Sequence, residues 1–269
     1  MAADNYILEN EAVIRLSLFA GVFLLIALWE LLAPKRALHY SKFQRWSTNW
    51  GFVVFNTLLV RLLFPIAAVG VAAYAQEHSI GLFNITAIYT PIAAFSAIIL
   101  LDLIIYWQHR FFHLVPVLWR VHQVHHADVD YDVSLGSRFH PLEIGLSMLI
   151  KFAAILVLGV PVVAVVIFEV LLNALAMFNH GNIRLPARLD GWIRRLIVTP
   201  DMHRVHHSTI SKEFNSNFGF QLSVWDRWFG SYQAQPSKGH QDMDIGLPYV
   251  QPPQKGMQWL SMLVMPFKR

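Results

Sequence analysis

Histidines at helical spacing are the residues of this sequence whose types and positions could do chemistry. Eight of the thirteen fall into three clusters, His109 and His113, then His122, His125 and His126, then His203, His206 and His207. Residues three and four apart share one face of an α-helix, so each cluster is predicted to aim its imidazoles in one direction. Neutral imidazole is a common ligand of iron, zinc and copper. A solvated polar face would explain one isolated histidine, whereas the recurring spacing predicts a metal site.

Four further residues extend this prediction. His180, in the segment FNHGN, is predicted to be a ninth ligand, and His140, in RFHPLE, is either a ligand or the start of a helix. Asp102 and Tyr106 precede the first cluster by seven and three residues and so share its helical stripe. We expect them to support the site, with Asp102 accepting the second ring N–H of a ligand histidine. The alternative for Asp102 is an ion pair with Arg61.

Composition places the chain in a membrane. Hydrophobic residues make up 55% and charged residues 14%, and the mean hydropathy is +0.44. The net charge of +4 comes from basic residues beside apolar segments, which suits anionic lipid headgroups and not a nucleic acid. The absence of cysteine excludes disulfides, iron–sulfur clusters and thiolate metal sites.

The apolar segments predict an all-α fold of about three full membrane spans plus a helical hairpin, with a helical cap that carries the metal site. A span needs roughly 20 apolar residues, and the segments 12–32, 50–75 and 88–107 supply them. The apolar stretch 144–178 is interrupted by Gly and Pro near position 160 and reads as the hairpin. With the turn there, Lys151 and Glu169 lie at matching depth, and we expect them to pair because an unpaired charge within a bilayer is costly.

Charge distribution sets the predicted orientation. The basic loop 33–49 is expected in the cytoplasm by the positive-inside rule, which puts the N-terminus outside and the histidine clusters on the cytoplasmic side. The first apolar segment is expected to stay as an anchor. A compact chain without a fused donor domain or a retrieval signal favours a bacterial inner membrane over the endoplasmic reticulum.

The cap is expected to consist of short helices. Residues 185–198 suit a helix in the membrane interface, and Thr199-Pro200-Asp201 reads as a helix start. We expect one membrane domain over 1–269, with transmembrane helices over 12–107, the catalytic region over 94–230 and a C-terminal tail over 231–269. The tail is expected to hold an interfacial helix around 257–265.

The three clusters resemble a known family. HRFFH, HQVHH and HRVHH fit the pattern HxxxH, HxxHH, HxxHH of the fatty acid hydroxylase/sterol desaturase superfamily, integral-membrane non-haem di-iron oxygenases. The segments DLIIYWQHRFFH, LWRVHQVHH and FGFQLSVWDRWFG are also similar to that family. The resemblance covers residues 94 to 230.

This resemblance implies a ligand set and a reaction. Two iron ions, which zinc can replace in purified protein, would be held by His109, His113, His122, His125, His126, His180, His203, His206 and His207. Some relatives carry a further histidine where this chain has Arg184, so a tenth ligand stays open. The implied reaction is hydroxylation of an unactivated carbon of a lipid with O2 and external electrons. Desaturation by the same site is the alternative.

Partners follow from the same comparison. With no HPGG haem signature, no Gly-rich dinucleotide fingerprint and no cysteine, we expect a separate ferredoxin or cytochrome b5-type electron donor with its reductase. The lipid stays open among sterol, fatty acid, sphingolipid, carotenoid and ether lipid, as does the oligomeric state. A His-rich membrane metal transporter or a haem protein is the more remote alternative, and the largely apolar spans do not favour a transporter.

Overall fold

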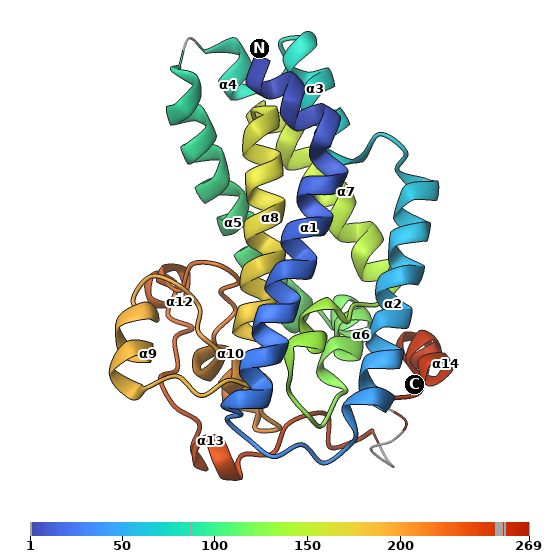
Figure 1. Ribbon diagram of the computed structural model, residues 1–269, viewed down its shortest axis with the longest axis vertical. Helices are drawn as coiled ribbons and strands as arrows, with labels where there is room; N and C mark the ends of the chain where they lie inside the picture. Colours follow the sequence, from blue (N-terminus) through green and yellow to red (C-terminus); the bar gives the residue numbers. More distant parts are fainter. Residues whose placement is uncertain (1, 87, 251–254, 256, 269) are drawn as a thin grey trace.

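The computed structural model describes residues 2–86, 88–250, 255 and 257–268, and the regular structure within these residues is helical apart from isolated β-bridges. Long helices form an upright bundle, and the short helices of a cap gather at one end of it (Figure 1). The helices are α1 (Ala2–Leu32), α2 (Lys42–Leu63), α3 (Ala67–Glu77), α4 (Leu82–Ile85), α5 (Thr90–Leu114), α6 (Pro116–His126), η1 (Val133–Ser137), α7 (Pro141–Leu158), α8 (Val162–Asn179), α9 (Ala187–Ile193), α10 (Pro200–His206), α11 (Ser211–Phe214), α12 (Val224–Trp228), α13 (Gly239–Asp242), α14 (Trp259–Val264) and η3 (Met265–Phe267).

Five helical segments of the described chain are long and apolar enough to cross a membrane, at Asn10–Leu32, Lys42–Ile85, Thr90–Leu114, Pro141–Leu158 and Val162–Asn179. The predicted all-α fold with several candidate membrane helices is thereby confirmed. The second segment differs in detail from the expected single helix over 50–75. α2 ends at Leu63 and α3 starts at Ala67, because Pro65 cannot supply a backbone N–H to continue the helix.

The predicted hairpin is formed by α7 and α8. α7 ends at Gly159, whose φ of 66° lies in the left-handed region that favours glycine. The turn packs against Gly81, where a side chain would meet the backbone of Gly159. Lys151 Nζ lies 2.6 Å from Glu169 Oε1, which confirms the predicted pair. Arg15 of α1 adds a second cation, 2.9 Å from the other oxygen of Glu169.

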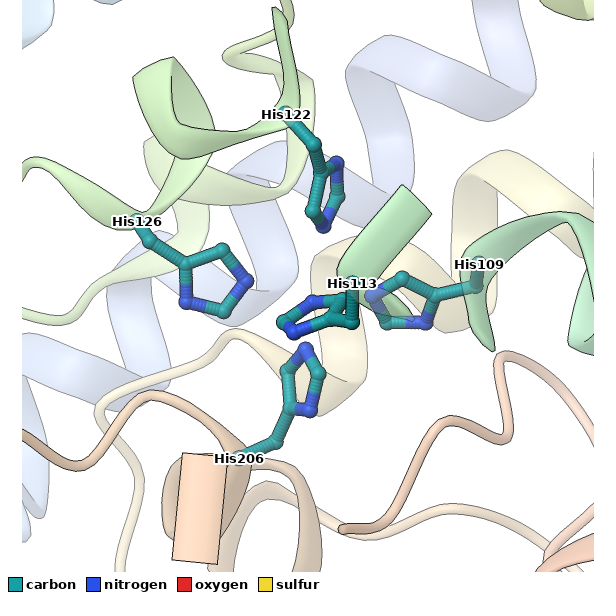
Figure 2. Close-up of side chains that lie close together, drawn as sticks. All are labelled: His109, His113, His122, His126 and His206. Atoms are coloured by element: carbon teal, nitrogen blue, oxygen red, sulfur yellow. The ribbon is translucent and has the colours of Figure 1, made fainter. Parts of the chain in front are cut away.

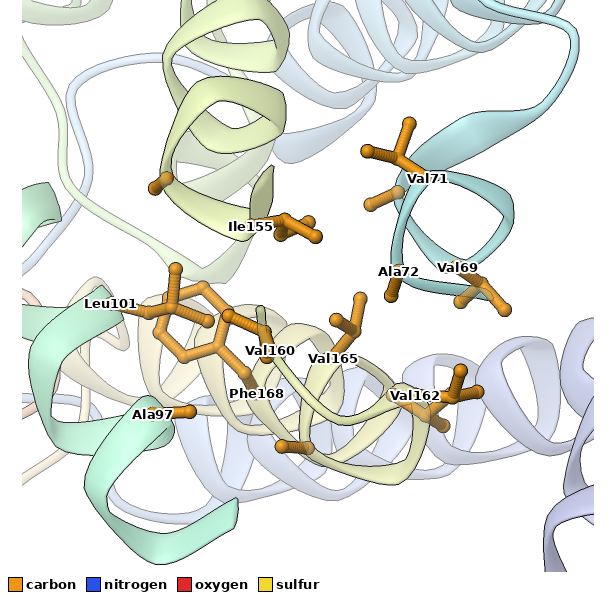
Figure 3. Close-up of a cluster of buried hydrophobic side chains, with 14 residues drawn as sticks. Val69, Val71, Ala72, Ala97, Leu101, Ile155, Val160, Val162, Val165 and Phe168 are labelled. Carbon is orange, nitrogen blue, oxygen red and sulfur yellow. The ribbon is translucent and has the colours of Figure 1, made fainter. Parts of the chain in front are cut away.

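The bundle packs around small side chains. Ala72, Ala97 and Ala164 of α3, α5 and α8 are completely buried, and larger side chains such as Ile155 and Phe168 fill the space between the helices (Figure 3). Small residues let helix backbones approach closely, and in lipid this packing replaces the hydrophobic effect as the force that holds helices together.

The predicted helix start at Thr199 and two of the expected short helices are present in the cap. Thr199 caps α10 by accepting from the backbone N–H of Met202, and Pro200 occupies the first turn. α9 and α14 lie within the segments 185–198 and 257–265, where short helices are expected, and α12 is a further short helix. α14 packs on α2, with the Trp259 ring 5.6 Å from that of Phe52, so the end of the tail is part of the fold.

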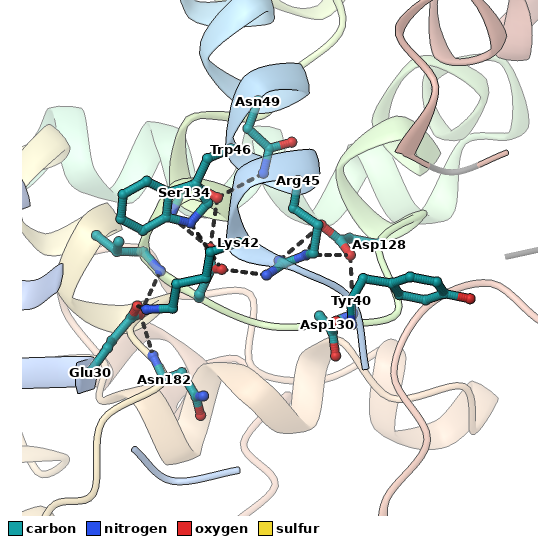
Figure 4. Close-up of polar contacts among 12 residues, drawn as sticks. Glu30, Tyr40, Lys42, Arg45, Trp46, Asn49, Asp128, Asp130, Ser134 and Asn182 are labelled. Carbon is teal, nitrogen blue, oxygen red and sulfur yellow. Dashed lines mark hydrogen bonds and ion pairs between the residues drawn. The ribbon is translucent and has the colours of Figure 1, made fainter. Parts of the chain in front are cut away.

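A buried polar network ties the loop 127–140 to the start of α2 (Figure 4). The Arg45 guanidinium donates to both carboxylate oxygens of Asp128, at 2.9 to 3.1 Å, and forms a short ion pair with Asp132. Arg138 contributes a second cation, 3.1 Å from Asp128. All four side chains are at most 1% exposed, so this network holds the loop in one place on the bundle.

Glu30 at the end of α1 extends this anchoring to the segment after α8. Its carboxylate accepts from Lys42 Nζ at 2.9 Å and from the backbone N–H groups of Val133 and Asn182 at 2.7 and 2.8 Å. Because Asn182 follows His180 by two residues, the same carboxylate links α1, α2, η1 and the end of α8.

Candidate metal centre

Nine buried histidines meet where the bundle joins the cap, and they divide into two groups. The first group is His109, His113, His122, His126 and His206, and the second is His125, His180, His203 and His207. Within each group the potential ligand atoms lie within 4.8 Å of one another. Figure 2 shows the five rings of the first group converging from α5, α6 and α10. All nine predicted ligands are therefore brought together.

The two HxxHH clusters serve both groups. Successive residues on an α-helix lie about 100° apart around the axis, so adjacent histidines point in different directions. His122 and His126 face the first group while His125 faces the second, and in α10 only His206 faces the first. The prediction that each cluster aims in one direction is therefore wrong for the two HxxHH clusters. They instead bridge the two groups, and the rings of His126 and His207 stack 4.4 Å apart.

Hydrogen bonds fix the tautomers of several rings. Nδ1 of His109, His206, His180 and His125 lies 2.7 to 3.2 Å from the backbone carbonyl of Phe218, Ser216, Ala176 and Arg138, respectively. A carbonyl oxygen can only accept, so each Nδ1 carries the proton. The Nε2 atom of each neutral ring is then left as a bare lone pair.

The donor set fits metal ions. Nε2 of His125 and Nε2 of His180, both bare by this argument, lie 3.1 Å apart, and two lone pairs at that distance repel unless a cation lies between them. Ligands bound at right angles and roughly 2.1 Å from one ion lie about 3 Å apart. In the first group Nε2 of all five rings is buried without a hydrogen-bond partner among the described residues.

Burial keeps the imidazoles neutral. Removal from water lowers the pKa of His180 to about 4 and that of His206 to about 3. The same desolvation, reinforced by neighbouring imidazoles, lowers the pKa of His126 and His207 well below the usual value. These rings therefore present lone pairs at neutral pH, as metal ligation requires.

The family follows from the chain's match to known proteins. Residues 94–231 match the fatty acid hydroxylase family over just over half of the chain. The chain belongs to this family. It is an integral membrane protein with several candidate spans, and its buried histidine groups are consistent with the metal site typical of fatty acid hydroxylases.

Curated relatives act on different lipids by name. Human alkylglycerol monooxygenase is 29% identical over 154 residues, covering 55% of this chain and 32% of that protein. Ornithine lipid hydroxylase OlsE of Rhizobium tropici is 27% identical over 165 residues, covering 61% and 47%. Mouse lathosterol oxidase is 28% identical over 151 residues, covering 56% and 48%. This chain thus spans a third to a half of their lengths. No solved structure matches it significantly.

The predicted roles of Asp102 and Tyr106 need correction. The Asp102 carboxylate accepts from the backbone N–H groups of Gln221 and Leu222 and from Trp225 Nε1, at 2.8 to 3.3 Å, rather than from a histidine or Arg61. The Tyr106 hydroxyl lies 2.8 Å from Ser231 Oγ. Asp102 thus contacts the loop that follows α11, and the Tyr106 ring lies 6.5 Å from that of Phe218 in the same loop.

The FGFQLSVWDRWFG segment, residues 218–230, begins in this loop and holds it in place. Asp226 accepts from the backbone N–H groups of Phe218 and Gly219 at 2.7 and 2.8 Å, and a side chain at Gly219 would collide with it. The loop thus held provides the carbonyls of Ser216 and Phe218 to His206 and His109. Asp102 and Asp226 therefore position histidines through the backbone.

The remaining residues are placed as follows. His140 is the N-cap of α7: its Nδ1 accepts from the N–H of Leu142 and its Nε2 donates to the carbonyl of Leu263. Both ring nitrogens are thus used for structure. Arg184 is exposed, and its backbone N–H donates to Ala33, so this position adds no ligand to the groups.

Sequence reasoning missed Glu143. Its carboxylate Oε1 lies 2.7 Å from His122 Nδ1, and both side chains are buried. This is the carboxylate–histidine contact predicted for Asp102, and such a contact fixes the orientation of the ring. The available signal was the acid in the first turn after His140-Pro141, three residues into a predicted helix.

Replacing Glu143 by glutamine should weaken metal binding about tenfold, at the lower end of the effect of such contacts. The amide keeps a hydrogen bond to His122 but loses the negative charge that favours the ligated imidazole. The measurement is competition for iron with a chelator. His140→Asn is the matched control, because it keeps the cap of the same helix and touches no ligand. Equal losses in the two variants would contradict the assignment.

Proposed function

We propose that this chain is a lipid hydroxylase that inserts one atom of O2 into an unactivated C–H bond. The balanced reaction takes R–H, O2, two electrons and two protons to R–OH and water. The observation that carries the proposal is the pair of buried imidazole groups, five and four rings, at the end of an apolar bundle in a fatty acid hydroxylase. Bare nitrogens facing one another support metal binding rather than a structural role.

The chain contributes histidine ligands whose orientations are fixed before metal binds. We assign one iron ion to each group, nine histidine ligands in all, with zinc as a substitute in purified protein. Iron bound there would supply the reduction of O2 and the oxidation of the C–H bond. Backbone carbonyls and Glu143 hold the distal nitrogens of five rings, so their Nε2 atoms need little rearrangement.

Aromatic side chains line the outside of both groups and limit access of water. The Phe214 ring lies 4.9 Å from that of His113, and the Phe139 ring stacks 4.7 Å from that of His125. Excluding water strengthens electrostatic interactions and protects reactive species from side reactions. These contacts suit an oxidation directed at an apolar chain.

A lipid substrate is supported by the apolar bundle and by the names of the relatives, which include hydroxylases and oxidases of unlike lipids. We assign the catalytic region to residues 94–230 of a single membrane domain. We place its metal centre on the cytoplasmic side, because the basic loop 33–49 is expected there. A separate electron donor would reach the centre from that side.

Labelled oxygen tests the reaction. Membranes containing the chain should convert a lipid of the host to a product that carries one atom from 18O2, and the His206→Ala variant should not. Lipids would be compared by mass spectrometry with and without label. A product that lacks the label and has a new double bond would identify a desaturase instead. No change in any lipid, in a sample with two irons per chain and a competent reductant, would contradict the proposal.

A further inference from the structure

Trp119 of α6 connects the first histidine group to the surface. Its ring centroid lies 5.1 Å from that of His113, 5.5 Å from His126 and 6.2 Å from His122. The side chain is partly exposed, whereas the three histidines are buried. One conjugated ring system therefore spans from three proposed ligands of one ion to the outside of the protein.

One exposed cation follows Trp119 in the chain, and another belongs to α11, which packs on Trp119 through Phe214. Arg120 follows Trp119 directly and is exposed, and Lys212 is exposed two residues before Phe214, whose ring lies 4.9 Å from that of Trp119. Tyr249 is 60% exposed and donates to Gln123 at 3.1 Å. We call Trp119, Arg120, Lys212 and Tyr249 the donor face.

Acidic charge close to this face is turned inward. Glu213, next to Lys212, is buried, and its carboxylate accepts from the backbone N–H of Ser237 at 2.6 Å. The donor face therefore combines two exposed cations with the partly exposed ring of Trp119. Such a surface is complementary to an acidic protein.

We propose that the donor face is the docking site of a small acidic one-electron carrier protein, and that electrons reach the first histidine group through Trp119. The inference rests on the proposed function. In each docking event the reduced carrier gives one electron to a ferric ion, leaving oxidised carrier and a ferrous ion. Two events supply one turnover. Opposite charges speed the encounter, and electron-transfer complexes are small and short-lived.

The exposed cations of α9 and of the turn that follows it fit a different partner. Arg188 and Arg195 are exposed, but they accompany Trp192 and Leu196, which are 67% and 57% exposed. Large apolar side chains interleaved with arginine are typical of a helix in the membrane interface. α9 is therefore the matched control surface, with the same charge and no contact to a histidine group.

The test follows reduction of the iron-loaded full chain by reduced plant-type ferredoxin, an acidic carrier, in a stopped-flow spectrometer. Charge reversal in R120E/K212E should slow the second-order rate about tenfold at low ionic strength, and added salt should shrink the difference. R188E/R195E should react as the unchanged protein does. Trp119→Leu should lower the limiting rate at saturating ferredoxin, where docking is complete.

Dithionite separates the outcomes, because a small reductant needs no docking site. Every variant that is reduced by dithionite at the normal rate has an intact centre. Given that, an unchanged ferredoxin rate in R120E/K212E, or a loss in R188E/R195E instead, would overturn the docking site. An unchanged limiting rate in Trp119→Leu would overturn the path. A chain that binds no reducible iron would overturn the proposed function, and the docking proposal with it.

Discussion

Alanine at His125 and His206 together should reduce bound iron from two ions per chain to one or none and abolish lipid oxidation. Each substitution removes one ligand from a different group, because His125 belongs to the group of four and His206 to the group of five. The single variants should differ. His125→Ala leaves three imidazoles and should lose its ion more readily than His206→Ala, which leaves four.

Elemental analysis of protein purified in mild detergent provides the count, and Mössbauer spectroscopy shows which site is lost. His78→Ala is the control, since His78 is exposed and bonds to the backbone of Tyr74 on the same helix. Iron at the unchanged level in the double variant would contradict the ligand assignment. No stoichiometric metal in well-folded unchanged protein would contradict the metal centre itself.

Replacing Arg45 by methionine should cost about 3 kcal/mol or more of stability, because it strips the partner from two buried carboxylates. Asp128 and Asp132 have no exposed side-chain surface, so neither can recover the loss in water. Arg138 is a poor substitute for Arg45, because its guanidinium is already engaged by Asp128 and by the backbone carbonyl of Val124. Thermal unfolding in detergent measures the effect.

A double-variant cycle shows whether charge is the cause. Asp132→Asn in the Arg45→Met background removes one unpaired charge while its Oδ1 still accepts from Ser134. The double variant should therefore be more stable than the single variant Arg45→Met. The matched surface control is Lys238→Met, which breaks the exposed ion pair with Asp244 and should cost less than about 1 kcal/mol. Additive losses in the cycle would show that Arg45 acts through packing.

Local patterns predicted the parts of the structure that local chemistry determines. The start of α10 at Thr199 and Pro200, the turn of the hairpin and the depth match of Lys151 with Glu169 follow from residues near in sequence. The division of the histidines into five and four did not follow. This division depends on the angles at which α5, α6 and α10 cross. The sequence of an HxxHH motif does not show which of its histidines belongs to which group.

Contacts between distant segments account for the errors. Asp102 meets residues about 120 positions away, and Arg45 meets Asp128 across 83. Nothing in one sequence distinguishes Asp102, which holds a loop, from Glu143, which touches His122. A carboxylate seven residues before a histidine on the same helix was the more conspicuous candidate, and its contact with the loop 215–223 could not be anticipated from helix periodicity.

The distribution of ligands along the chain orders the events of biogenesis. The first group lacks His206, and the second lacks both His203 and His207, until the ribosome has passed the end of α10. All five candidate spans precede that point. The proposed iron ions would therefore enter a chain whose membrane helices have already been synthesised, and His206 and His207, the last two of the nine to be synthesised, would complete the two groups together. A chain truncated before α10 contains all five candidate spans but lacks three of the nine histidines of the two groups.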